Sequence, residues 1–130
     1  MDDERFEQLV DEGIASIPER FLKKLDNVAI VILDEPTLEQ LRMNHIPKGD
    51  TLLGLYEGIP LTERGEAYGG LVLPDTITIF KDPIIADAGG DEDSVRRVVR
   101  ETLWHEIAHY FGYDDEGIEE REQKGTNYSV

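Results

Sequence analysis

The chain contains no cysteine among its 130 residues, so disulfide bridges and thiolate zinc fingers are excluded. Any bound metal ion would have to be held by histidine and carboxylate side chains. Histidine is scarce as well, with three in the whole chain. His45 lies among turn-forming residues, far from the other two, and we interpret it as a surface residue. His105 and His109 are therefore the histidines to consider for metal binding.

Long apolar runs are also missing. The longest, Val28–Leu33, has the length of a strand, whereas a membrane span needs about 18 consecutive apolar residues. The acidic start of the chain, residues 1–5, is not followed by the apolar stretch that a secretory signal contains. We therefore expect a cytoplasmic protein without a membrane partner, folded as a single domain over residues 1–130.

Basic residues are few. The sequence has 13 lysines and arginines against 29 aspartates and glutamates, which gives a formal net charge of -16. Such a charge repels phosphate backbones and anionic lipid headgroups. Nucleic acid is therefore not expected as a partner, and we attribute most of the acidic surface to solubility.

Helical spacing of apolar residues predicts packing helices over Asp3–Ala15 and residues 18–25. Thr37 is expected to cap a short helix that follows it. A long helix is predicted over residues 94–111, with Asp91 or Asp93 as its N-terminal cap, and acidic residues at its start suit the helix dipole. Gly112 is then expected to adopt a left-handed conformation that ends the helix and reverses the chain.

Three segments have the character of strands. Residues 27–33 are continuously apolar and rich in β-branched side chains, which predicts a strand covered on both faces at the centre of the sheet. Residues 52–57 are a plausible second strand. Residues 71–80 alternate between polar and apolar side chains, which predicts a half-buried strand. Residues 83–90 are expected to form a connector.

Pro74 favours an edge position for the strand within residues 71–80. An edge strand carries unpaired N–H and C=O groups, which either form a plain structural edge or pair with an extended peptide. The predicted substrate-binding residues are Thr76, Ile77, Thr78 and Ile79.

Residues 105–109 have the sequence His-Glu-Ile-Ala-His, the HExxH pattern of zinc hydrolases. Helical residues four apart lie one turn above each other, so His105 and His109 can bind one ion. Glu106 lies beside them and is the predicted general base, which takes a proton from water activated by the metal. The alternative is a pair of core histidines with Glu106 as an ion-pair partner, but burying these groups without a cation would be costly.

A catalytic zinc site needs a third protein ligand. The reversal expected at Gly112 can bring Asp115 to the same ion, at the position where the longer zincin motif has its third histidine. Other carboxylates within reach of this turn remain alternatives for the third ligand. They are Asp114, Glu116, Glu119 and Glu120.

The chain resembles the minimal zincin-like metallopeptidase family of small bacterial proteins over residues 6–120. The resemblance rests on three segments together with Gly112 and Asp115. The segments are 54–61 (Gly-Leu-Tyr-Glu-Gly-Ile-Pro-Leu), 73–80 (Leu-Pro-Asp-Thr-Ile-Thr-Ile-Phe) and 102–109 (Thr-Leu-Trp-His-Glu-Ile-Ala-His). The methionine turn of metzincins has no counterpart, because the only methionines are Met1 and Met43.

The resemblance implies an α+β fold, a compact minimal zincin-like arrangement in which a small mixed sheet has an edge strand beside an active-site helix. It also implies a zinc-dependent metallopeptidase that hydrolyses a peptide or protein substrate. His105, His109 and Asp115 would be the ligands of zinc (Zn²⁺), and Glu106 would be the base. A carboxylate ligand makes the site harder than three histidines would, so other divalent ions are compatible with it.

Two other functions are open at this point. A metal-stabilised module could bind peptides without cleaving them. A metal-dependent endoribonuclease of the bacterial rRNA-maturation type shares the Gly112-Tyr113-Asp114 segment, but it has glycine at the position of Glu106 and histidine at that of Asp115. The net charge of -16 also opposes RNA binding. Neither the substrate preference nor the oligomeric state is encoded in a recognisable motif.

Overall fold

The computed structural model describes residues 1–58 and 74–112. Helices pack with a sheet that mixes parallel and antiparallel pairs, so the predicted α+β class is confirmed. The helices are α1 (Asp3–Ala15), α2 (Glu19–Leu22), α3 (Leu38–Met43), α4 (Lys81–Ala88) and α5 (Glu92–Tyr110). The strands are β1 (Val28–Leu33), β2 (Gly54–Glu57) and β3 (Asp75–Phe80).

The described strands form a three-stranded sheet in the order β1-β3-β2. β1 runs parallel to β3, and β2 runs antiparallel to it, with Tyr56 opposite Ile77. Among the described strands β3 is therefore central, so within this part of the sheet the predictions that residues 27–33 form the centre and residues 71–80 an edge are wrong. The pairing on both sides of β3 also removes the edge that was the reason for assigning peptide binding to Thr76, Ile77, Thr78 and Ile79.

Both errors have a physical cause. Pro74 directly precedes β3, so its missing N–H group costs the strand no ladder hydrogen bond. Thr78, a polar member of the alternation, is buried all the same, with 2% of its surface exposed. β1 is less covered than its apolar sequence suggests, because Val31 and Leu33 remain 38% and 40% exposed.

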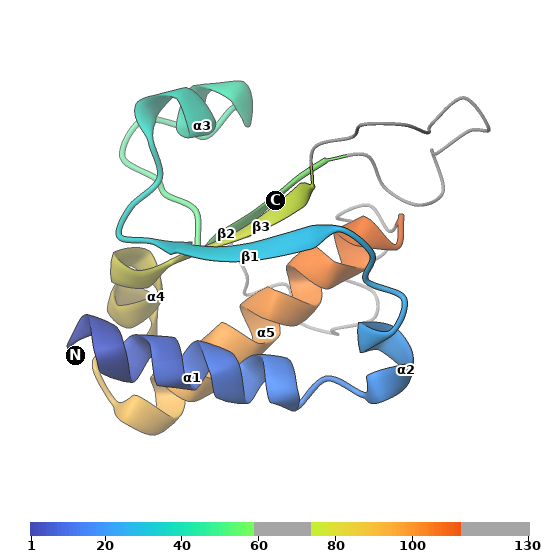
Figure 1. Ribbon diagram of the computed structural model, residues 1–130. Helices are drawn as coiled ribbons and strands as arrows, with labels where there is room; N and C mark the ends of the chain where they lie inside the picture. The colour runs from blue at the N-terminus through green and yellow to red at the C-terminus, as the bar shows by residue number, and fades with distance from the viewer. Residues whose placement is uncertain (59–73, 113–130) are drawn as a thin grey trace.

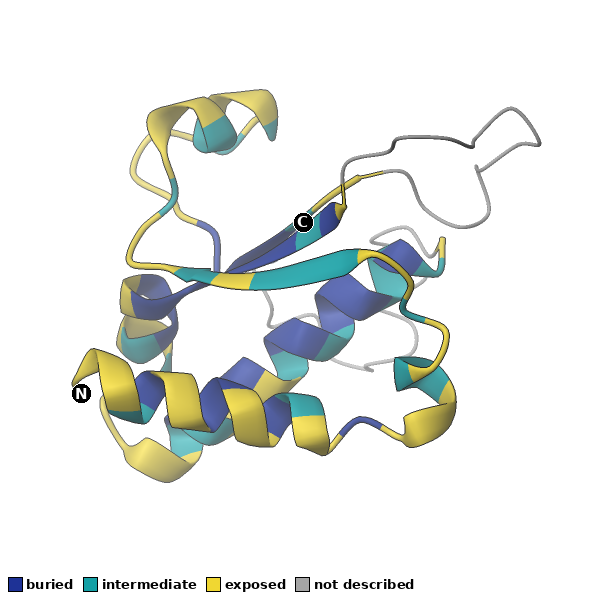
Figure 2. Ribbon diagram, in the orientation of Figure 1, coloured by how far each residue is buried: buried dark blue, intermediate teal, exposed yellow. Residues whose placement is uncertain are grey.

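The sheet lies between α3 on one side and α1 and α5 on the other (Figure 1). The buried residues concentrate in β3 and on the facing sides of α1 and α5 (Figure 2). At Gly13 of α1, an added Cβ would lie 2.7 Å from Leu103 Cδ1 of α5, so the two helices cross closely. The main core comprises Phe6, Leu9, Val10, Ile17, Leu53, Ile77, Ile79, Ile84, Val95, Val98, Val99, Leu103 and Ile107.

The ends of α5 follow from local sequence. The Asp91 side chain accepts a hydrogen bond from the Ser94 N–H at 3.1 Å and caps the helix. Gly112 has a φ of 95° and its N–H donates to the His109 carbonyl at 2.9 Å, which confirms the predicted left-handed turn. His45 is exposed, as predicted.

Residues 83–90 were expected to form a connector, but most of them belong to α4. Pro83 lies in the first turn of this helix, where a missing N–H group breaks no intrahelical hydrogen bond. Among the described residues, none of the helices is both long enough and apolar enough to cross a membrane.

The position of β3 can be tested by amide hydrogen exchange. A central strand has all of its N–H groups in ladders, whereas alternate N–H groups of an edge strand point away from its partner. We expect the amides of residues 76–79 to exchange uniformly slowly. An alternating pattern within residues 76–79, measured by NMR, would show that β3 is an edge after all.

A second test concerns the link between the last turn of α5 and the segment before β1. The buried Tyr110 hydroxyl accepts from the Asp26 N–H at 3.1 Å and lies 3.3 Å from the Lys24 carbonyl. Tyr110→Phe leaves the Asp26 N–H without this acceptor, so the free energy of unfolding should fall by about 1–2 kcal/mol. Urea denaturation measures the change, and an unaltered midpoint would contradict the role of this hydroxyl.

Candidate metal centre

His105 and His109 lie one turn apart near the C-terminal end of α5. Their ring centroids are 5.1 Å apart and the ring planes meet at 73°. Both ring nitrogens of His105 and Nε2 of His109 are buried beneath the molecular surface. The structure therefore brings together the two predicted histidine ligands, with these nitrogens shielded from bulk water.

Glu106 is fully buried, and both of its carboxylate oxygens are inaccessible to solvent. Its carboxylate lies against β2, because a Cβ built on Gly54 would be 3.2 Å from Oε2 and 3.3 Å from Cγ of Glu106. The carboxylate is thus held between α5 and β2.

Thr102 lies one turn before Glu106 and packs against the same strand. Its hydroxyl donates to the Val98 carbonyl at 2.7 Å, so its methyl group is left to face β2. A Cβ on Gly54 would be only 2.5 Å from this methyl carbon. Gly54 is a site residue that the sequence interpretation missed, although an isolated glycine in a strand is a known signal of close backbone approach.

Tyr56 is a second residue that was missed. It lies two positions after Gly54, on the same face of β2. Its ring is nearly parallel to the His109 imidazole, at 12° and a centroid distance of 6.5 Å. Its hydroxyl donates to Asp75 Oδ2 at 2.5 Å. β2 is therefore the strand beside the histidines, the place that had been given to residues 76–79.

The third predicted ligand, Asp115, lies outside the described residues, as do Asp114, Glu116, Glu119 and Glu120. Within residues 1–58 and 74–112, no three histidine or carboxylate side chains are close enough together to hold one metal ion. Glu106 consequently does not complete a ligand set with the two histidines there. Its position is compatible with the role of a base.

The donors present fit a divalent cation such as zinc. Two imidazoles spaced by one helical turn are the ligand pair that zinc accepts most readily in a protein without cysteine. A cation also offsets the cost of burying a carboxylate beside two imidazoles. The partial negative charge at the C-terminal end of α5 adds to the attraction for a cation at this position.

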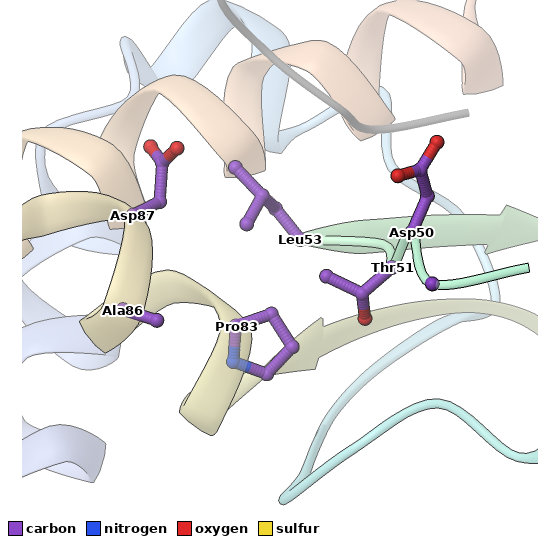
Figure 3. A pocket seen from close by; sticks show the side chains of 7 residues that line it. Asp50, Thr51, Leu53, Pro83, Ala86 and Asp87 are labelled. Carbon is purple, nitrogen blue, oxygen red and sulfur yellow. The ribbon is translucent and has the colours of Figure 1, made fainter.

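Two cavities that are lined by described residues do not include the histidine pair in their lining. One of about 360 Å³ has an apolar wall that includes Leu53 and Pro83, with Asp50 and Asp87 on opposite sides (Figure 3). Another, of about 420 Å³, lies between α3 and β2, and Tyr56 contributes to its lining. Tyr56 therefore borders this cavity and also contacts His109.

Ion pairs fasten the opposite end of α5 to α1. Arg5 pairs with Glu92, and this contact lowers the pKa of the Glu92 carboxyl. Arg96 bonds Glu12 Oε2 at 2.8 Å, which raises the pKa of the Arg96 guanidinium. These exposed pairs lie at the N-terminal half of the helix and help to orient α5 without entering the site.

Comparison with known proteins agrees with this geometry. The family model for zincin-like metallopeptidases matches residues 25–125. A solved structure of a conserved hypothetical protein from T. thermophilus has 27% sequence identity to the chain and a TM-score of 0.56. The match covers 84% of this chain and 92% of that one. Among curated proteins, no significant match is found.

Replacement of Gly54 tests the contact between β2 and α5. In Gly54→Ala the new methyl group would overlap Thr102 Cγ2 and press on Glu106, so the strand and the helix must separate. We expect a loss of about 1–3 kcal/mol in the free energy of unfolding, the usual cost of an overpacked contact. Chemical denaturation of the purified variant measures this loss.

Thr102→Ser provides the matched control, because it removes Cγ2 and keeps the hydroxyl that bonds the Val98 carbonyl. The double variant Gly54→Ala/Thr102→Ser should recover part of the stability lost in Gly54→Ala. Strictly additive losses in the two single variants would show that Gly54 and Thr102 are not in contact.

Proposed function

The chain belongs to the zincin-like metallopeptidase family, and from this membership we propose that it is a zinc-dependent peptidase in which Glu106 is the general base. The observation that carries the proposal is the burial of His105 and Glu106, together with Nε2 of His109, at one end of α5 against β2. A purely structural metal site closes all of its coordination positions and has no need of a base beside it.

His105 and His109 would hold the metal ion, together with Asp115 after the turn at Gly112. When bound, zinc supplies Lewis acidity, which polarises a carbonyl group and acidifies water. Glu106 would accept a proton from the attacking water and return it to the leaving amine. Its attachment to α5 and its contact with β2 keep the carboxylate in one orientation throughout these transfers.

The peptide or protein substrate is proposed to approach along β2. This strand carries Gly54 against Glu106 and Tyr56 against His109, whereas β3 is covered along this side by β2 itself. The proposal therefore replaces residues 76–79 with the β2 side of the sheet. A chain with a net charge of -16 is unsuited to an RNA substrate, which supports a peptidase over a nuclease.

Glu106→Gln tests the role of the base. The amide is nearly the same shape but cannot accept the proton, so cleavage should fall by about 10²–10⁴-fold. The bound metal should remain, because Glu106 is not a proposed ligand. The measurements are cleavage of a peptide library by mass spectrometry and metal content by elemental analysis.

Glu101→Gln makes the same chemical change on α5 at a position that pairs with Arg97, and it should leave cleavage unchanged. His109→Ala and Asp115→Ala should lose the metal. Full activity in metal-loaded Glu106→Gln would disprove the general-base assignment. Metal binding by the wild type without cleavage of any peptide would instead favour a metal-stabilised peptide-binding module.

A further inference from the structure

We propose that Tyr56 and Asp75 form a positioning pair that fixes the imidazole of His109 for metal binding. The inference rests on the proposed function, since it takes His109 to be a metal ligand. It goes beyond the HExxH motif because both residues come from the sheet. Neither would touch the metal, so both are positioning residues.

The first support is the register of the sheet. Tyr56 of β2 lies opposite Ile77 of β3, and Asp75 lies two residues before Ile77 on the same face. Diagonal neighbours of this kind in an antiparallel pair are within reach of a long side chain. The Tyr56 hydroxyl spans this distance and donates to Asp75 Oδ2 at 2.5 Å.

The second support is the burial of the acceptor, Asp75, and its packing against neighbouring backbone. Asp75 is 3% exposed, although aspartate is rarely buried. It begins β3, the strand paired on both sides, and its N–H donates to the Asn27 carbonyl at 3.0 Å. At Gly58 an added Cβ would overlap Asp75 Cγ, so the backbone after β2 also packs directly against the carboxylate.

The third support is the contact of the Tyr56 ring with two side chains of α5, His109 and Tyr110. The ring lies nearly parallel to the His109 imidazole, at 12° and 6.5 Å, and edge-on to the Tyr110 ring, at 86° and 6.3 Å. These separations fall within the range of favourable aromatic pairs. A ring tied to the sheet at its hydroxyl thereby restricts the rotation of His109 in the last turn of α5.

The consequence for metal binding is pre-organisation. A histidine that must first find its orientation loses side-chain entropy when it binds an ion, and a ring already restricted by its neighbours loses less. Groups that orient a metal ligand from outside the coordination sphere typically change metal affinity by about 10–100-fold when they are removed. Tyr56 and Asp75 should have an effect at the lower end of this range, because they are proposed to act through the ring contact between Tyr56 and His109.

The test measures zinc affinity by competition with a chromophoric chelator, in the wild type and in variants of the pair. Tyr56→Phe removes the hydroxyl and keeps the ring, and Asp75→Ala removes the acceptor. Each should weaken zinc binding by about 10-fold. Because both break the same contact, Tyr56→Phe/Asp75→Ala should be no weaker than either single variant. Asp75→Asn retains an acceptor oxygen and should bind zinc more tightly than Asp75→Ala.

Tyr110→Phe is the matched control, since it makes the same change in the neighbouring ring and should lower stability without lowering zinc affinity. The absorption spectrum of cobalt-substituted protein gives a second readout. It should change in Tyr56→Phe and Asp75→Ala and stay the same in Tyr110→Phe, at a temperature where circular dichroism shows every variant to be folded.

The outcomes are distinguishable. Wild-type protein that binds zinc, together with Tyr56→Phe and Asp75→Ala variants of unchanged affinity and unchanged cobalt spectrum, would overturn the positioning role and leave the proposed function intact. Wild-type protein that binds no zinc, or His109→Ala protein that binds it as tightly as the wild type, would overturn the proposed function and the positioning role with it.

Discussion

The candidate site depends on how closely β2 approaches α5. At Gly54 the backbone of the strand lies so near Thr102 and Glu106 that no side chain fits between them. This approach places a polar helix face, which would otherwise border solvent, under a strand. It also sets which residues of β2 meet the helix. A slip of one residue in the pairing with β3 would present Leu55 in place of Gly54 and destroy the contact.

The same approach has an electrostatic cost. It buries the Glu106 carboxylate and the His105 imidazole, and it half-buries His109. Such burial persists in a stable protein when a charge of opposite sign compensates it. The ion pairs Arg5–Glu92 and Arg96–Glu12 join α1 and α5 at the opposite half of α5. A cation near His105 and His109, as proposed above, would compensate the buried carboxylate.

The parts of this arrangement that depend on interactions between residues close in the sequence could be predicted. The apolar spacing of α1, the cap at Asp91 and the left-handed turn at Gly112 depend on residues within a few positions of one another. The placement of His105, Glu106 and His109 on one helix belongs to the same class, since it needs only the helical repeat. For the third ligand, the sequence supplies a candidate in Asp115, beyond the described residues.

Strand neighbours could not be predicted in this way, because pairing joins residues far apart in the chain. Alternation in residues 75–80 indicates which side chains share a face, but it is the same for a central strand and for an edge strand. The error about β3 and the omission of Tyr56 therefore have one origin. The contact between Tyr56 and Asp75 follows from the observed register of β2 with β3. The contact between the Tyr56 ring and His109 follows from the packing of β2 on α5. Neither the register nor the packing can be read from the sequence. The helix carries the residues that the motif identifies, and the sheet supplies the surroundings that orient them.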